Sequence, residues 1–212
     1  MKKQLVYIGI LLIAIQFSCK KEISDLQFEK NVLNEVFVEI ADSIYRDRRL
    51  MLPPPSPDIN FKTNKKDTIG FQNRLKEYYR FQDSIKNDTT KILLAVYDSV
   101  KASKEKWFKK SRNSIKTYKL DLTLFKNNKK FNFKSSSSFP DQWTWDINEI
   151  NNSLPVGEIY VCRIQFNDKK NKGILEAAST CGGGKCGKGY LITIENKSGH
   201  WRISKIKETW VS

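Results

Sequence analysis

The sequence of 212 residues contains one histidine, ten glycines and four cysteines, and only 23 acidic residues against 38 lysines and arginines. The single histidine, His200, restricts any serine or cysteine catalytic triad to one candidate base, and it stands in a predicted turn beside Gly199 and Trp201. No signature singles out a pair of carboxylates for glycoside cleavage. With one histidine and no signature for a carboxylate pair, the sequence shows no recognisable catalytic site, and its excess of lysine and arginine favours a basic binding or structural protein.

The N-terminus has the pattern of an export signal. Lys2 and Lys3 precede the thirteen-residue apolar run 5–17, which is shorter than the about 20 residues needed to cross a bilayer and suits a signal peptide. Ser18 and Cys19 follow, and a small residue before cysteine resembles a lipoprotein signal. That resemblance implies cleavage after residue 18 and lipid attachment at Cys19. The alternative is an ordinary signal peptide that is cut nearby.

The residues after Cys19 indicate which membrane would hold the lipid anchor. Lys20, Lys21 and Glu22 follow it, and no aspartate stands where the inner-membrane retention rule of other lipoproteins requires one. We therefore expect an outer-membrane lipoprotein, and the sequence does not distinguish between the two leaflets.

Three cysteines remain once Cys19 is assigned to lipid, in a compartment that permits disulfides. Cys181 and Cys186 are separated by four mostly glycine residues, so their Cα atoms can approach within the ~7 Å that a bridge requires. Such a small loop contributes about 2 kcal/mol by the chain-entropy estimate. A predicted hairpin places Cys162 opposite Ala177 or Ala178, about 10 Å from Cys181 at the usual strand rise. We predict a disulfide between Cys181 and Cys186 and a buried free thiol at Cys162.

The glycine-rich stretch "TCGGGKCGKGY" also matches three functional patterns superficially. Residues 182–188 fit G-x-x-x-x-G-K, but Gly189 replaces the required serine or threonine, and a predicted strand follows where a phosphate-binding loop needs a helix. The cysteines lack the C-x-x-C spacing of a redox pair. The stretch therefore predicts a turn, in which Lys185 and Lys188 are candidate partner contacts.

A zinc site is the remaining pattern. Cys162, Cys181, Cys186 and His200 together form a Cys₃His set, but zinc sites favour paired ligands at defined spacing. We expect no metal and no cofactor.

Two helices are predicted in the N-terminal half. Apolar residues recur every fourth position through 26–49 with Ser24 as the N-cap, and they predict a helix packed on the domain. The cations of 46–49 are expected at its C-terminal end. The prolines of 53–57 predict an extended spacer, and 68–85 predicts a second, shorter helix.

The remainder predicts strands. Residues 91–100 suit a buried strand, and 118–125 alternates strictly, with three leucines on one face. In 157–166, Tyr160 and Cys162 point to one side, and in 190–195, Tyr190, Ile192 and Ile194 point inward. Turns at 167–173 and 196–200 complete an antiparallel meander. Trp143 and Trp145 share one face if their segment is extended. Paired tryptophans can form a surface that stacks on a sugar, but packing in the core or at an edge is the more common role of such a pair, and we favour it.

Lysines are spread along the chain as pairs, without an arginine-rich block or an aromatic-basic ladder. This pattern favours a solvated basic surface over a specific nucleic-acid site.

The last fifty or so residues contain a "CG…CG.GY" turn, here Cys181-Gly182 and 186–190, a "GKW"-like hairpin at 199–201, and a terminal "WVS" at 210–212. In these features the segment resembles the C-terminal end of small, uncharacterised Bacteroidota-type envelope lipoproteins. Four residues separate the cysteines here where the pattern has three. The resemblance implies an α+β lipoprotein and brings no activity.

The sequence thus predicts a signal peptide (1–18), a segment with lipid tether, amphipathic helix and proline-rich linker (19–57), and a domain (58–212). The expected fold is α+β, with N-terminal helices packed on a mostly antiparallel sheet that ends at the C-terminus. The expected function is a non-catalytic binding or structural lipoprotein, held to the membrane by its lipid, with a protein as the candidate partner. The alternatives are a periplasmic immunity protein against a toxin and an unrecognised hydrolase. Oligomeric state stays open.

Overall fold

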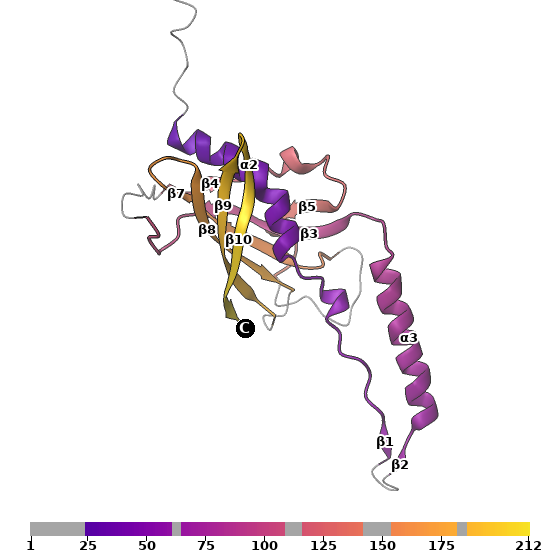
Figure 1. Ribbon diagram of the computed structural model, residues 1–212. Coiled ribbons are helices and arrows are strands. Elements are labelled where there is room, and N and C mark those ends of the chain that lie inside the picture. The colour runs from indigo at the N-terminus through magenta and orange to yellow at the C-terminus, as the bar shows by residue number, and fades with distance from the viewer. Residues whose placement is uncertain (1–23, 61–64, 109–115, 142–153, 182–185) are drawn as a thin grey trace, which may run out of the picture.

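The computed structural model describes residues 24–60, 65–108, 116–141, 154–181 and 186–212. These residues form an eight-stranded sheet with a long helix, α2 (Asp25–Ile44), on one face. A second helix, α3 (Thr68–Lys86), belongs to an arm that projects from this body (Figure 1). The two helices come first in the chain and the sheet is mostly antiparallel, so the predicted α+β class is confirmed.

The sheet has the strand order β10-β9-β8-β6-β3-β4, with β5 paired to β3 and β7 paired to β8. The strands are β3 (Ile92–Lys101), β4 (Tyr118–Lys119), β5 (Phe131–Ser135), β6 (Glu158–Cys162), β7 (Gln165–Phe166), β8 (Lys172–Thr180), β9 (Lys188–Lys197) and β10 (His200–Val211). Strand β3 runs parallel to β5 and β6, and the other pairs are antiparallel. The predicted meander is present as β8–β9–β10.

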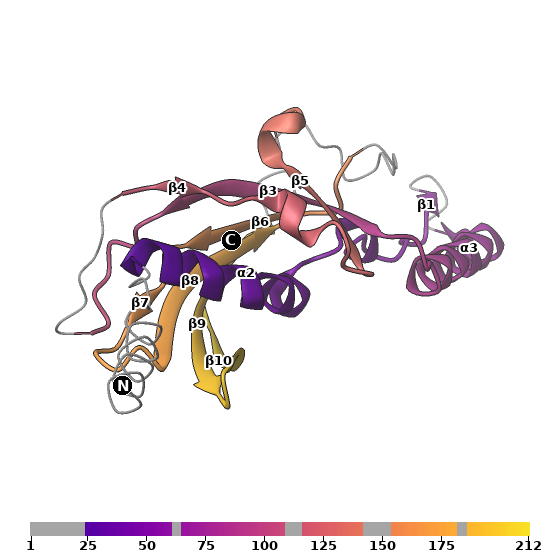
Figure 2. The same ribbon diagram turned by 90° about the horizontal axis from the view of Figure 1, so that it is seen from above.

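Helix α2 begins and packs as its sequence pattern predicts. The Ser24 hydroxyl accepts a hydrogen bond from the Gln27 N–H at 3.3 Å, which satisfies one free donor of the first turn. Its apolar stripe is buried against the inner face of the sheet, which contributes Ile159, Leu175 and Ile192. Figure 2 shows the helix along one side of the sheet. The folded body therefore includes α2, although the sequence grouped it with the tether segment 19–57.

The predicted C-terminal end of this helix is wrong. The helix ends at Ile44, because Tyr45 takes an extended conformation with ψ 151°. Asp47 then caps a short 3₁₀ turn, η1 (Arg48–Leu50), by accepting the Arg49 N–H at 2.9 Å. The cations of 46–49 consequently lie beyond the helix and do not stabilise its dipole.

A buried ion pair joins α2 to the sheet. The Glu29 and Arg163 residues are 4% and 7% exposed. Arg163 Nε donates to both Glu29 oxygens at 3.0 Å, Nη2 also contacts the carboxylate, and the Ile164 N–H donates to it at 3.0 Å. A carboxylate can be buried when charged and neutral donors satisfy it in this way. The pair lies where β6 ends, so 157–166 is not one continuous strand.

The strand predicted over 118–125 is also shorter than expected. Only Tyr118–Lys119 pairs with β3, because Asp121 accepts the Thr123 N–H at 3.0 Å and starts a 3₁₀ turn, η2 (Leu122–Phe125). A third 3₁₀ turn, η3 (Ser136–Ser138), forms within the serine run without a side-chain cap. Asp side chains that bond to the backbone two residues on compete with strand formation.

The arm consists of the proline-rich segment and α3. Tyr78 OH donates to the Leu52 carbonyl at 2.9 Å, and Arg74 lies 3.0 Å from Asp58. A short ladder of β1 (Ile59–Asn60) and β2 (Lys65–Lys66) lies at its tip. In α3 only Gln82 is buried, so this helix is held by the extended segment and by its root, rather than by the sheet. None of the described helices is long and apolar enough to span a bilayer.

Candidate functional site

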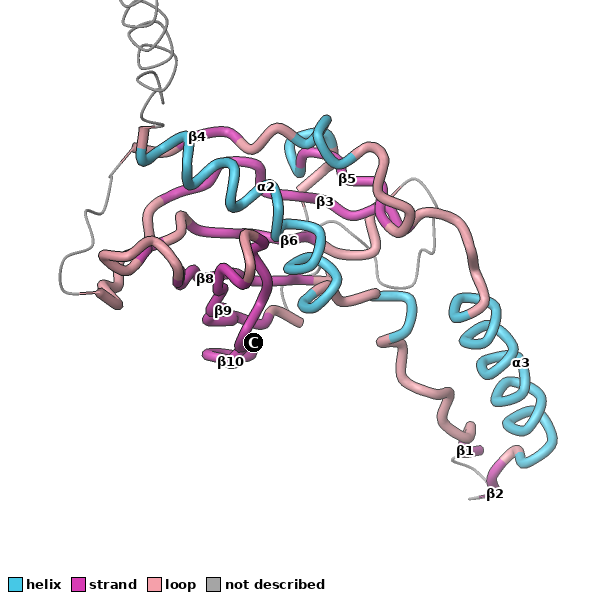
Figure 3. The backbone as a smooth tube through the Cα atoms, turned by 45° about the horizontal axis from the view of Figure 1, so that its top comes forward, coloured by secondary structure: helices cyan, strands magenta, loops and turns pink. Residues whose placement is uncertain are grey.

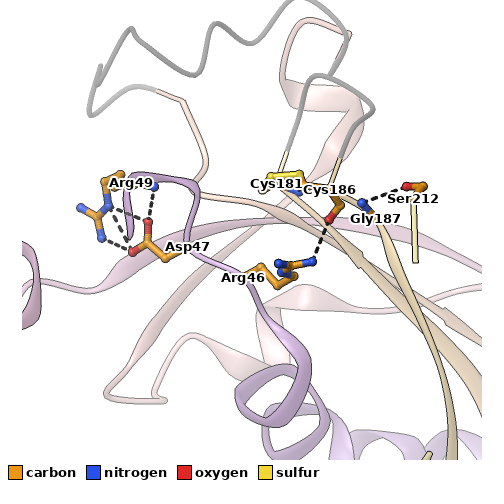
Figure 4. The surroundings of a disulfide bond; sticks show 7 residues. All are labelled: Arg46, Asp47, Arg49, Cys181, Cys186, Gly187 and Ser212. Carbon is orange, nitrogen blue, oxygen red and sulfur yellow. Dashed lines mark hydrogen bonds and ion pairs between the residues drawn. A yellow bond between two sulfur atoms is a disulfide. The ribbon is translucent and has the colours of Figure 1, made fainter. Parts of the chain in front are cut away.

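The predicted disulfide is present between Cys181 and Cys186, with a Cα–Cα distance of 5.7 Å. Figure 4 shows that it lies beside the segment that follows α2. Arg46 Nη1 donates to the Cys186 carbonyl at 3.3 Å, and the Gly187 N–H donates to the Ser212 hydroxyl at 3.1 Å. The bridge therefore helps to hold the end of α2 and the C-terminus together at one corner of the sheet.

Cys162 is a buried free thiol, as predicted. Its Sγ donates to Tyr160 OH at 3.2 Å, and burial raises its pKa to about 11. Because a thiolate is the reactive form, this cysteine is unreactive near neutral pH. The predicted register is wrong by a small shift, since Val161 and Tyr160 stand opposite Ala177 and Ala178.

The other predicted site residues are separated from one another. Lys188 donates to Glu208 at 2.8 Å across β9 and β10, so its ammonium is already paired. Cys19, Lys185 and the tryptophans Trp143 and Trp145 lie outside the described residues. His200 is exposed at the start of β10, and its Nδ1 lies 3.3 Å from Glu35 Oε1. That pair joins β10 to α2.

A cavity of about 670 Å³, lined by many charged residues, lies where the arm joins the body, and we call it the arm-root cavity. Four backbone or side-chain hydrogen bonds assemble it from distant segments. The Arg48 N–H donates to the Val156 carbonyl at 3.0 Å, Val156 to Leu93 at 2.9 Å, Ile92 to Lys130 at 2.9 Å, and the Gln82 amide to Arg49 at 3.2 Å. The end of α2, the end of α3, the start of β3 and the loop before β5 thus share one site.

Cations outnumber carboxylates around this cavity. Its lining contains six cationic side chains and two carboxylates, a difference of four positive charges: Arg48, Arg49, Lys86, Lys91, Lys129 and Lys130 against Asp47 and Asp88. Because opposite charges attract, an anion in the cavity would be attracted by most of the charged side chains around it.

The two carboxylates are already engaged. Arg49 Nε donates to both Asp47 oxygens, at 3.0 and 3.2 Å, and Nη2 donates to one of them at 2.7 Å. Arg49 Nη1 lies 3.8 Å from Asp88. Hydrogen bonds from the Thr90 side chain and N–H lower the pKa of Asp88, so it stays ionised and is not suited to donate a proton. Arg48 and Arg49 together equal the two carboxylates in charge, and the four lysines account for the excess.

The lysines differ in how strongly they are held. Lys130 contacts Asp42 and lies 4.8 Å from the centre of the Tyr45 ring, and Lys91 Nζ donates to the Lys126 carbonyl at 3.0 Å. Among the described residues, no acidic group lies within ion-pair distance of Lys86 or Lys129. These two ammonium groups are therefore available to a ligand. Apolar side chains, including Leu93 and Val156, complete the lining.

A second cavity of about 620 Å³ is lined by residues of β3, β5 and the turn after β4, including Asp98 and Asp121. Hydrogen bonds from the Thr123 side chain and N–H lower the pKa of Asp121, and Lys119 Nζ lies 3.3 Å from Asp98. Elsewhere, burial raises the pKa of Glu158, the Ser136 hydroxyl opposes this rise, and Asp141 adds to it.

Within the described part of the chain, no group of three or more His, Cys, Asp or Glu side chains is arranged to hold a metal ion. Comparisons with models of protein families, with curated proteins and with solved structures found no match. The fold and the cavity define an α+β protein with a cationic site at the root of a projecting arm.

The arm-root cavity was missed by the sequence reasoning. Its cations occur in the segments "RDRR" and "NNKK" and around "KNDTTK". Each segment looks like an ordinary solvated turn, and only the pairing of Ile92 with Lys130 and of Arg48 with Val156 unites them.

Proposed function

We propose that the protein is a lipoprotein of the cell envelope, tethered at Cys19, which binds an anionic ligand in the arm-root cavity without transforming it. The observation that carries this proposal is the excess of four positive charges around one cavity. The lysines of the cavity are exposed and are therefore screened by salt, but they converge on one site, so their attractions for a bound anion add. The apolar part of the lining would contact the non-ionic portion of the ligand.

The predicted anchor suits this arrangement. Cys19 precedes Asp25 by six positions, which limits the distance from the lipid to α2 to about 20 Å of extended chain. Helix α2 has 20 residues and is therefore about 30 Å long. The cavity lies at its far end, so a tethered molecule would present the cavity away from the membrane.

The lipid tether is tested by Cys19→Ala in the full-length chain. Loss of acylation and a shift from the membrane to the soluble fraction are expected. Unchanged processing and unchanged membrane fractionation would show that the chain is not a lipoprotein.

Ligand binding is tested on the soluble mature chain with tripolyphosphate as the probe, titrated by calorimetry. Lys86→Gln/Lys129→Gln removes the two unpaired ammonium groups, and Lys104→Gln/Lys106→Gln is the control, with the same charge change on exposed residues elsewhere. At about 0.5–1 kcal/mol for each exposed cation, the cavity pair should weaken binding by about 5- to 30-fold and the control should not. An equal loss in both variants would indicate diffuse attraction to a basic surface and would refute the site.

A further inference from the structure

Strand β10 forms one margin of the sheet, beyond β9 (Figure 3). It is 12 residues long, which is longer than a protected edge strand usually is, although it also carries lysines and two β-bulges, which can protect an edge from pairing. The Trp201 and Ile203 N–H groups of β10 donate to the Glu35 and Glu39 carboxylates of α2, at 3.0 and 3.4 Å. From Lys205 onward, the outer backbone groups of β10 have no partner strand among the described residues, and this part of the edge can accept an additional strand.

The register shows which side chains of β10 lie on the face away from α2. Tyr190, Ile192 and Ile194 of β9 are buried in the core, so the alternate residues of β9 point to the opposite, open face. The β10 residues paired with those alternate positions are Arg202, Lys205, Lys207 and Trp210, opposite Glu195, Thr193, Leu191 and Gly189. We call these four residues the β10 strip.

The charge of the β10 strip is not neutralised within the described chain. Glu195, the nearest acid in the register, lies 3.3 Å from Lys172, and Glu208 points to the other face and accepts from Lys188. Three cations therefore remain in a row. Apolar groups beside them are exposed as well: Ile206 is 37%, Trp210 is 48% and Val211 is 64% exposed.

We propose that β10 accepts, as a further strand of the sheet, an extended acidic segment of a partner protein. Side chains on one face of a strand repeat every second residue, about 6.8 Å apart. Lys205 and Lys207 have this spacing, with Ile206 between them on the other face. The complementary segment has carboxylates at alternate positions and apolar residues between them, so that its backbone pairs with β10 while its acids meet the strip.

A second copy of this chain is a poor occupant of the same edge. Two β10 strands related by a two-fold axis keep each side chain on its own face, so the lysines of both copies would lie together on the open face. Registers centred on Ile206 or Lys207 place lysine directly opposite lysine, which is unfavourable. Two β-bulges, between Ile203 and Lys205 and between Glu208 and Trp210, further confine regular pairing to the segment between them.

The test uses a labelled eight-residue peptide that alternates glutamate with valine, titrated by fluorescence anisotropy against the soluble mature chain. A second peptide has the same side chains but N-methyl groups on the amides that would pair with β10. The matched protein variants are Lys205→Glu/Lys207→Glu and, as control, Lys104→Glu/Lys106→Glu. Circular dichroism verifies that both variants fold.

Saturable binding of the first peptide is expected, with at least tenfold weaker binding of the N-methylated peptide and of the Lys205→Glu/Lys207→Glu variant, and little change in the control. Equal binding of both peptides would show attraction without strand pairing and would overturn the proposal. Absence of binding would show that the lysines and bulges only protect the edge. Loss of binding in Lys86→Gln/Lys129→Gln would place the peptide in the arm-root cavity and would also overturn it.

Discussion

Replacing Glu29 by alanine should destabilise the protein more than any substitution of a surface charge. The change removes the Glu29 carboxylate from the Arg163 guanidinium, which is 7% exposed, and removes the acceptor of the Ile164 N–H. Breaking one side of a buried ion pair costs about 3–5 kcal/mol. Arg163 keeps its bond to the Lys116 carbonyl at 2.8 Å, which does not compensate the charge.

We therefore expect Glu29→Ala to lower the free energy of unfolding by about 4 kcal/mol, a large part of the 5–15 kcal/mol of an ordinary domain. The melting temperature should fall by about 8–16 °C at about 2–4 °C per kcal/mol. Urea unfolding followed by circular dichroism measures the first quantity, and calorimetry measures the second.

Two variants make this prediction specific. Asp42→Ala breaks the ion pair with Lys130, in which the Asp42 side chain is 50% exposed, and should cost at most about 1 kcal/mol. Glu29→Met/Arg163→Met removes both buried charges and should be more stable than Glu29→Ala. If Glu29→Ala costs no more than Asp42→Ala, the buried pair does not hold α2 on the sheet, and this reasoning is refuted.

Three further results are expected. Cys181→Ser/Cys186→Ser should lower the free energy of unfolding by about 2 kcal/mol, because the bridge closes a loop of sequence separation five; a loss below about 0.5 kcal/mol in urea titration would contradict this. Burial raises the pKa of the Cys162 thiol from 9.0 to about 11 in the folded chain. Iodoacetamide should therefore alkylate Cys162 at pH 8 about 100-fold more slowly in the folded chain than in the urea-unfolded chain. Similar rates would show that the thiol is exposed. Burial raises the pKa of the Glu158 carboxyl, so its ionisation favours the unfolded state, and the natural chain should lose stability as pH rises above 4.5. The free energy of unfolding of Glu158→Gln should therefore rise relative to that of the natural chain over this range. A difference between the two that is constant from pH 4 to pH 8 would contradict this.

Local patterns predicted the elements that depend on neighbours in sequence. The four-residue apolar repeat and Ser24 identified α2, and the alternation through Tyr190, Ile192 and Ile194 identified the inner face of β9. The disulfide followed from the short, glycine-rich spacing of its cysteines. In each case the deciding interaction lies within a few residues.

Features that depend on long-range pairing were not predicted. The end of α2 is determined by the turn that Asp47 caps and by the bond from Arg48 to Val156. The parallel pairing of β3 with β5 has no local signal, although it brings Lys130 to the cavity. For the same reason the buried pair of Glu29 and Arg163, 134 residues apart in sequence, looked like two ordinary charged positions.

The central claim, that an anion binds at the root of the arm, is tested most directly by amide chemical-shift mapping of the mature chain during titration with tripolyphosphate. The account predicts that the largest shifts fall on the cavity segments around Arg48, Lys86, Lys91, Lys129 and Val156, and that Lys86→Gln/Lys129→Gln removes them. Shifts of similar size at lysine-bearing turns throughout the chain, retained in that variant, would contradict it.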